Sequence, residues 1–178
     1  MKDLTFYIKH YKNVLDKKIC KEIINQPDLA FYPATISGGK LNNKVRNCYS
    51  KKLDKKFDKI FFDAVALIIN KYKEDIKNFK GNDSNVEDTG YEHLLYMGSK
   101  TGFYTEHIDH SDRHPRVLSI SFLLNDNYEG GEFSFFGGEH ILPKETGSAI
   151  VFPSNFCFPH AVLPVTRGDR HAIITWIR

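Results

Sequence analysis

Residues 103 to 114, FYTEHIDHSDRH, gather several side chains of the types that bind metal ions. Within eight positions stand His107, Asp109, His110, Asp112 and His114. His107 and Asp109 are two positions apart, so on a regular strand both side chains leave the same face and can reach one ion. A tightly bound ion needs a further ligand from elsewhere in the fold. Without one, this stretch is a polar, solvated loop.

A third ligand is available in FCFPHAVLPV, where His160 stands 51 residues after Asp109. Two imidazoles and one carboxylate on one side of an ion leave the opposite positions open. This arrangement suits iron(II) and lets a substrate and dioxygen bind together. The same ligands also suit zinc or manganese, so spacing does not name the metal.

A permanent cation follows at a fixed distance, because Arg170 lies ten residues beyond His160, past the turn TRGD. It begins the last strand, RHAIITWIR, and we expect it one strand over from the metal. Alternation along that strand predicts a shared face for Arg170, Ala172, Ile174 and Trp176. A guanidinium at the end of an apolar pocket is suited to clamp a carboxylate through two parallel hydrogen bonds.

The elements that must position these residues differ between the two halves of the chain. In residues 1–90 the apolar spacing predicts a helix over 14–26 and a longer one from Leu53 to Ile76. Residues 28–50 contain proline and glycine and include the extended run NKVRNCYS, and residues 80–90 form a polar loop.

Residues 91–178 are instead rich in short β-branched and aromatic runs, separated by turns such as DNYEGG, LPKETG and FPSN. Many short strands without intervening helices predict an antiparallel jelly-roll core of about 90 residues. We therefore expect a mainly β protein with N-terminal helices as a buttress, forming a single domain over residues 1–178.

The composition is that of an ordinary globular protein, with 41% hydrophobic and 26% charged residues. The formal charge of +3 comes from interleaved charges of both signs, so neither a nucleic acid nor an anionic membrane is indicated as a partner. Cys20, Cys48 and Cys157 are far apart and odd in number, which fits a reducing compartment. The first residues have no apolar segment of the signal-peptide kind, and we expect a cytoplasmic protein.

The motifs HID, EGGEFSF, FPHAVLPVTRGDR and ITWI together resemble the iron(II)- and 2-oxoglutarate-dependent dioxygenases of the prolyl 4-hydroxylase type. The resemblance is close from Tyr91 to the C-terminus and looser before it. It implies a double-stranded β-helix fold with iron held by His107, Asp109 and His160. It also implies that 2-oxoglutarate chelates the iron and sets its far carboxylate on Arg170.

The resemblance also assigns roles to two tyrosines. Tyr96 would hydrogen-bond the cosubstrate, and Tyr104 would lie nearer the substrate. Trp176 is expected to be a packed strand residue that also walls the pocket on the substrate side. The gap between Tyr96 and Tyr104 is longer than the usual seven-residue pattern of the family. On their own, both tyrosines fit equally well as core aromatics.

The reaction that the resemblance implies hydroxylates an unactivated C–H bond, with a peptidyl proline as the first candidate substrate. Dioxygen is consumed, succinate and carbon dioxide are released, and ascorbate serves as reductant. In this division of labour the protein supplies orientation and a dry pocket, while the cofactor carries out the difficult chemistry.

Other polar residues near the motifs have less specific interpretations. His110, Asp112 and His114 are expected to be solvated or to face the substrate, with His110 on the side opposite to His107. His171 has the wrong parity relative to Arg170 and is interpreted as structural. Glu132 and Phe135 are expected in a hairpin and in the core, and Arg46 is either a surface residue or a substrate contact.

Three alternative functions stay open. The substrate can be a free amino acid or small metabolite, because the motifs specify the cosubstrate rather than the substrate. Nucleic-acid dealkylation is disfavoured, because the second arginine typical of that branch is replaced by Trp176. A non-catalytic, cupin-like metal-binding jelly roll would have no need for Arg170. For the enzyme readings, residues 28–50 and 80–90 are predicted to be mobile lids over the site.

Overall fold

The computed structural model describes residues 3–26, 30–79 and 87–178. The larger of two antiparallel sheets contains β1 (Lys9–Tyr11), β2 (Tyr32–Pro33), β4 (Tyr49–Lys52), β5 (Glu92–Met97), β7 (Leu118–Leu123), β11 (Ala149–Pro153) and β14 (Asp169–Ile177). The smaller contains β3 (Arg46–Asn47), β6 (Phe103–His107), β9 (Phe133–Phe135), β10 (His140–Leu142) and β12 (His160–Val162). A separate ribbon pairs β8 (Glu129–Gly130) with β13 (Val165–Arg167).

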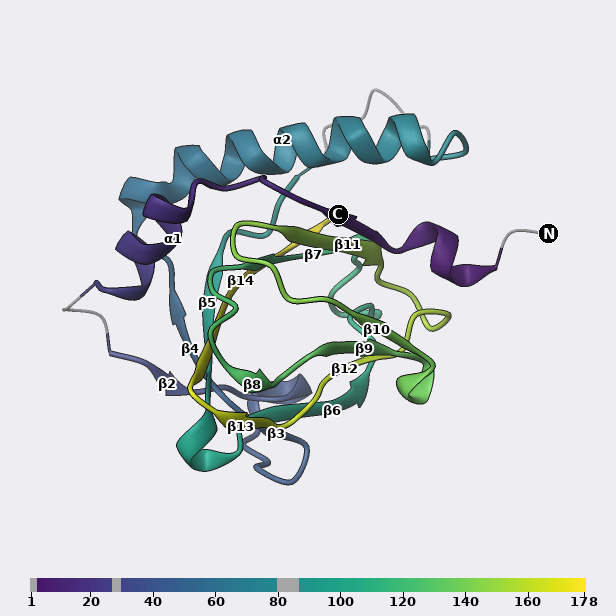
Figure 1. Ribbon diagram of the computed structural model, residues 1–178. Helices are drawn as coiled ribbons and strands as arrows, with labels where there is room; N and C mark the ends of the chain where they lie inside the picture. Colours follow the sequence, from purple (N-terminus) through teal and green to yellow (C-terminus); the bar gives the residue numbers. More distant parts are fainter. Residues whose placement is uncertain (1–2, 27–29, 80–86) are drawn as a thin grey trace.

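The two sheets face each other as a jelly roll (Figure 1). The strand order is β1-β11-β7-β14-β5-β4-β2 in the larger sheet and β10-β9-β12-β6-β3 in the smaller. From β6 onward the chain therefore passes back and forth between the sheets. This alternation brings side chains that are far apart in sequence to the space between the sheets, and it agrees with the predicted fold class.

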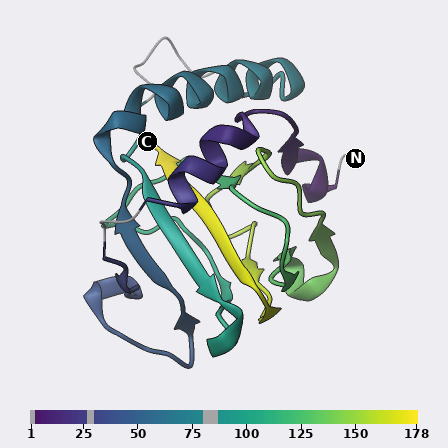
Figure 2. The ribbon, with the colours of Figure 1, turned by 60° about the vertical axis from the view of Figure 1, so that its left-hand side comes forward.

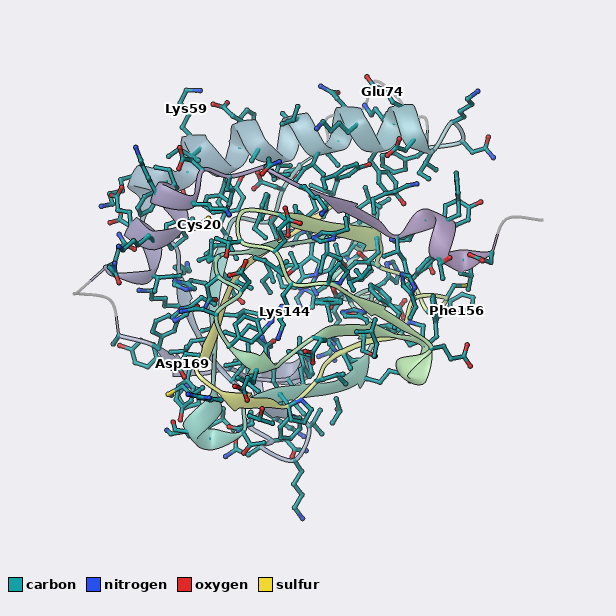
Figure 3. The ribbon with its side chains drawn as sticks, viewed as in Figure 1. Cys20, Lys59, Glu74, Lys144, Phe156 and Asp169 are labelled. Atoms are coloured by element: carbon teal, nitrogen blue, oxygen red, sulfur yellow. The ribbon has the colours of Figure 1, made fainter. Side chains whose placement is uncertain are left out.

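Within the described residues, two α-helices cover the outer face of the larger sheet: α1 (Lys17–Ile24) and α2 (Asp58–Asp75). Figure 2 shows α1 beside the strands and α2 across their end. Buried residues of both helices, such as Ile23, Phe61 and Ile68, share one cluster with Phe122 and Ile173 of the sheet. Lys59 and Glu74 point from α2 away from this core (Figure 3). The helices thus act as the predicted buttress.

Both helices are shorter than the apolar spacing predicted. The backbone N–H groups of Val14 and Leu15 donate to the carbonyl of Gly147, at 2.8 and 2.9 Å, which holds this stretch outside the helix. Asp16 then caps α1 by accepting from the backbone of Lys18. Before α2, the Leu53 N–H donates to the Tyr91 carbonyl, and a 3₁₀ turn over Lys55–Phe57 precedes the helix.

Two segments differ from or extend the sequence expectations. Strand β1 was not predicted, because its three residues are all only half-buried. Residues 80–86 of the predicted loop lie outside the described residues, whereas Thr89 donates its N–H to the Trp176 carbonyl. Neither helix in the described part of the chain combines the length and hydropathy of a membrane span.

Candidate active site

Three potential metal ligands meet between the two sheets. His107 ends β6 and His160 begins β12, and the two residues are direct partners in the smaller sheet. Asp109 joins them, with its Oδ1 3.5 Å from His107 Nε2 and its Oδ2 3.6 Å from His160 Nε2. One ligand atom from each residue lies within 4.8 Å of the others, so a single ion can contact all three.

The expectation that a regular strand holds both His107 and Asp109 was wrong, because β6 ends at His107. Asp109 is instead held by the larger sheet. Its Oδ2 accepts hydrogen bonds from the hydroxyl of Ser119 at 2.7 Å and from the indole N–H of Trp176 at 2.9 Å. Arg116 also donates to its backbone carbonyl at 3.1 Å. The Asp109 carboxylate therefore lies between the two histidines of the smaller sheet and its hydrogen-bond donors on β7 and β14 of the larger sheet.

The histidine rings have the orientations that a metal site needs. His107 Nδ1 lies 2.9 Å from the Thr105 carbonyl and His160 Nδ1 lies 3.1 Å from the Phe158 carbonyl. A carbonyl only accepts, so each Nδ1 donates its proton there, and each Nε2 faces Asp109.

The charges of the buried groups agree with that assignment. Burial lowers the pKa of His160 to about 4, so its ring is neutral. Burial by itself would raise the pKa of Asp109, but His160, His107 and the Trp176 hydrogen bond hold it well below its usual range. One carboxylate and two imidazoles that present their Nε2 atoms form the donor set of an open iron(II) site.

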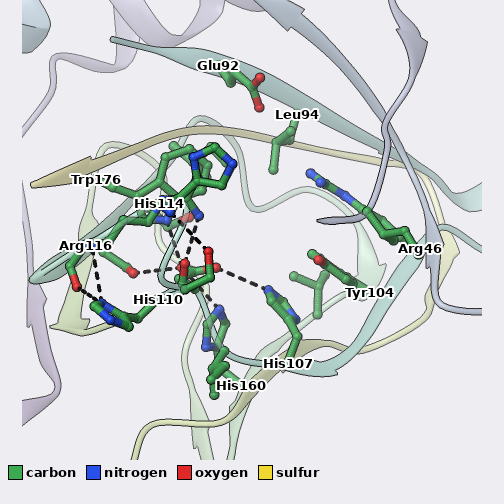
Figure 4. A pocket seen from close by; sticks show the side chains of 18 of the residues that line it. Arg46, Glu92, Leu94, Tyr104, His107, His110, His114, Arg116, His160 and Trp176 are labelled. Atoms are coloured by element: carbon green, nitrogen blue, oxygen red, sulfur yellow. Dashed lines mark hydrogen bonds and ion pairs between the residues drawn. The ribbon is translucent and has the colours of Figure 1, made fainter. Parts of the chain in front are cut away.

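A cavity of about 350 Å³ opens beside this cluster (Figure 4). Its walls include all the predicted site residues except Arg170: His107, Asp109, His160, Tyr96, Tyr104 and Trp176. His110 and His114 also line it, although His110 was expected on the side opposite to His107. Since β6 ends before His110, strand alternation does not apply there, and the imidazole lies against the Arg116 backbone.

Arg170 lies on β14 beside Tyr96 of β5, its direct partner in the larger sheet. The expectation that it would be one strand over from the metal was wrong, because His160 belongs to the facing sheet. The Arg170 side chain is 2% exposed, and its Nε has no hydrogen-bond partner. The guanidinium carbon lies 5.0 Å from the centre of the Tyr96 ring. Among the described residues, no carboxylate forms an ion pair with it.

The structure adds three residues that the sequence interpretation left aside or undecided. Ser119 could have been found from the run LSISF, in which serines alternate with buried apolar residues and so occupy the inner face. Arg116 stacks its guanidinium 3.5 Å from the Trp176 ring. Arg46, which was expected either on the surface or in contact with the substrate, lines the cavity as well.

His171 and Phe135 were both expected to have structural rather than site roles. His171 lies on the outer side of β14, with Nδ1 3.0 Å from Nε2 of His93, away from the cavity. Phe135 is fully buried between the sheets. Both places agree with structural roles.

The family model of the 2OG-Fe(II) oxygenase superfamily matches residues 92–178, the part of the chain that contains all three clustered ligands and Arg170. Residues 92–178 belong to the 2OG-Fe(II) oxygenase superfamily. The family predicted from the sequence motifs is thus confirmed.

Curated relatives of this chain include PKHD-type hydroxylases. One from Maricaulis maris is 37% identical over 81 residues, which are 42% of this chain and 36% of that protein. One from Alteromonas mediterranea is 46% identical over 63 residues, 34% of this chain and 27% of that protein. The matched region therefore spans about a third or less of the length of these relatives.

Solved structures match the chain over nearly its whole length. A prolyl hydroxylase from Trichoplax adhaerens, in complex with a hypoxia inducible factor peptide fragment, superposes with a TM-score of 0.73 at 18% identity, covering 97% of this chain and 84% of that one. A Pseudomonas putida prolyl-4-hydroxylase superposes with a TM-score of 0.69 at 22% identity, covering 97% and 92%. These likenesses confirm the predicted jelly-roll fold.

Proposed function

We propose that the protein is an iron(II)- and 2-oxoglutarate-dependent dioxygenase that hydroxylates an unactivated C–H bond, with a peptidyl proline as the first candidate. The observation that carries the proposal is the buried guanidinium of Arg170, which forms no ion pair with any described residue and lies over Tyr96, a wall residue of the cavity that contains the His–Asp–His cluster. A buried cation without an anion is costly. A dicarboxylate cosubstrate that enters the cavity supplies that anion.

His107, Asp109 and His160 would hold the iron. Their Nε2 lone pairs and carboxylate oxygens already converge, and the hydrogen bonds at each Nδ1 fix the ring orientations. Ser119 and Trp176 fix the carboxylate in the same way. When bound, the ferrous ion with 2-oxoglutarate and dioxygen supplies the oxidising chemistry, with succinate and carbon dioxide as by-products.

Arg170 and Tyr96 would hold 2-oxoglutarate. Arg170 presents donors in a plane suited to a carboxylate, and its guanidinium lies over the ring of Tyr96, which lines the cavity. Burial raises the pKa of Tyr96 well above its usual range, so its hydroxyl stays protonated and can donate a hydrogen bond to the cosubstrate. Neither residue has to move a proton for this role.

Tyr104 and Trp176 would form the substrate side, as aromatic residues in the cavity wall beside the ligands. A wall of this kind suits a proline ring or another compact aliphatic group and excludes water from it. The prolyl hydroxylases among the structural neighbours support a prolyl substrate.

The test is turnover with an open choice of substrate. Protein loaded anaerobically with iron(II) is mixed with 2-oxoglutarate and oxygen, and succinate is measured with and without ascorbate. Peptide and metabolite libraries are then searched by mass spectrometry for the gain of one oxygen. A hydroxylated prolyl peptide supports the full proposal, and a modified amino acid or metabolite moves the substrate to that class. Absence of succinate from iron-loaded protein would instead identify a non-catalytic metal-binding jelly roll.

A further inference from the structure

A column of three stacked side chains runs along one wall of the cavity and ends on a metal ligand. The ring of Tyr104 stacks on the imidazole of His107, with centroids 3.5 Å apart and planes 16° apart. The guanidinium carbon of Arg46 lies 4.7 Å from the centre of the Tyr104 ring. Figure 4 shows the three side chains one after another beside the cavity.

Backbone pairing fixes the column at its base. Arg46 and Tyr104 are direct partners between β3 and β6 in the smaller sheet, and His107 is three residues further along β6. The Thr105 carbonyl fixes the His107 ring through Nδ1. That hydrogen bond leaves the ring free to tilt about its axis, and the Tyr104 face packed against it restricts that tilt.

Arg46 is itself held at two points. Its Nε–H donates to the buried thiol of Cys48 at 3.1 Å, and its NH1 donates to the Thr35 carbonyl at 2.9 Å. No carboxylate among the described residues pairs with it. A cation with five donors that forms no ion pair, and whose charge sits over an aromatic ring, is placed for stacking and orientation rather than for a salt bridge.

We propose that Arg46 is a positioning residue for His107, acting through Tyr104, and that the Cys48 thiol locks Arg46 in this position. The inference rests on the proposed function for the identity of His107 as a metal ligand. Because Thr35 also lines the cavity, the column connects the segment before β3 to the metal centre.

Two measurements test the proposal without requiring turnover. The first is the affinity for cobalt(II), followed by its visible absorption in the absence of 2-oxoglutarate. Arg46→Ala should weaken binding about three- to tenfold, the equivalent of one lost cation–aromatic contact. The exposed Arg113→Ala serves as the matched control and should bind as wild type does. The second is the position of the His107 ring-proton resonances in the metal-free protein, which the stacked Tyr104 ring shifts upfield. In Arg46→Ala they should move downfield.

A double-mutant cycle separates this column from general loosening of the fold. Cys48→Ala should weaken cobalt binding in the wild-type background and have no further effect in the Arg46→Ala background. Cys48→Ser keeps an acceptor and should stay close to wild type. If Arg46→Ala does not fold, Arg46→Lys and Cys48→Ala provide the same readouts.

The proposal is overturned if Arg46→Ala leaves both the cobalt affinity and the His107 resonances as in wild type, or if the effects of Arg46→Ala and Cys48→Ala simply add. A wild-type protein that binds cobalt but produces no succinate would refute the proposed dioxygenase activity and leave this test in place. The two failures are therefore distinguishable.

Discussion

Replacing Arg170 by methionine should abolish tight 2-oxoglutarate binding without destabilising the ligand-free protein. Methionine keeps an apolar stem of similar length and removes the charge. In the ligand-free protein Arg170 is 2% exposed and forms no ion pair with any described residue, so the substitution breaks no salt bridge. It removes an unpaired buried cation, whose desolvation costs several kcal/mol. The free energy of unfolding of Arg170→Met should therefore be at least equal to that of wild type.

The opposite holds once the cosubstrate is bound. A carboxylate about 4 Å from the guanidinium contributes roughly 4 kcal/mol at an effective dielectric constant near 20. Losing one partner of such a buried pair typically costs about 2–5 kcal/mol, or roughly 30- to several-thousand-fold in affinity. Arg170→Lys keeps the charge but loses the forked geometry, so its affinity should lie between wild type and Arg170→Met.

The assay is urea unfolding of manganese-loaded protein with and without 2-oxoglutarate. At a ligand concentration of 100 times Kd, wild type should gain about 2.7 kcal/mol and Arg170→Met close to nothing at the same concentration. Manganese affinity should be the same in both proteins, because Arg170 contacts none of the three ligands. Equal stabilisation of both proteins by 2-oxoglutarate would refute the carboxylate clamp. A loss of several kcal/mol in ligand-free Arg170→Met would refute the claim that the cation is unpaired.

The remaining predictions concern the supports of the site. Asp109→Ala should abolish tight iron binding, since only two neutral ligands remain, and retained stoichiometry in iron(II) titrations would contradict this prediction. Trp176→Phe should weaken iron binding about 10- to 100-fold, because the carboxylate loses its indole hydrogen bond. Unchanged iron affinity in Trp176→Phe would contradict this second prediction. Gly131→Ala should destabilise by about 1–3 kcal/mol in urea unfolding, because φ is +67° and an added Cβ would lie 2.7 Å from a Val165 methyl; a wild-type midpoint would show that the turn adapts. Burial lowers the pKa of His93 to about 2 and of His171 to about 4, so the unfolded chain binds more protons below pH 6.5. The contribution of the two neutral imidazoles to the free energy of unfolding is complete above pH 6.5 and falls as the pH drops towards 4. At pH 5 the loss is on the order of 1–2 kcal/mol for each histidine. A variant that lacks both imidazoles should therefore show a flatter dependence of its unfolding free energy on pH.

The lid hypothesis for residues 28–50 and 80–90 stays a prediction for hydrogen exchange. Within the described residues, Tyr49–Lys52 belongs to the larger sheet and Arg46–Asn47 to the smaller, so these stretches should exchange slowly. Thr35, Ile36, Gly38 and Gly39 line the cavity outside any strand of the two sheets and should exchange faster. Equal protection of both groups would contradict a lid.

The types and order of the site residues were readable from the sequence, because chemistry depends on side-chain type and the motifs keep a fixed spacing. His107, Asp109, His160 and Arg170 were all predicted as site residues in this way, and the strand-rich composition after Tyr91 indicated the jelly roll. The local alternation of LSISF also contained the position of Ser119. These features depend on residues close together in the chain, where a period of two or a turn is visible directly.

Only the tertiary structure decided which sheet carries which residue. Ten residues separate His160 from Arg170, yet the chain crosses from the smaller sheet to the larger between them. Asp109 lies beyond the end of its strand, and its place depends on hydrogen bonds from residues 10 and 67 positions away. Such contacts follow from sheet pairing over long sequence distances, and no local periodicity encodes them.

The partners of the charged side chains were equally beyond the sequence. Arg46, Arg116 and Arg170 are the same residue type, and their guanidinium groups lie over the rings of Tyr104, Trp176 and Tyr96, respectively. Arg170 is in addition almost fully buried and forms no ion pair with any described residue. Whether a guanidinium is solvated, stacked or unpaired depends on what the fold packs around it, and so does the energy of its charge. The sequence therefore determined which groups could bind iron and a carboxylate, and the packing of the two sheets decided which of them face the same cavity.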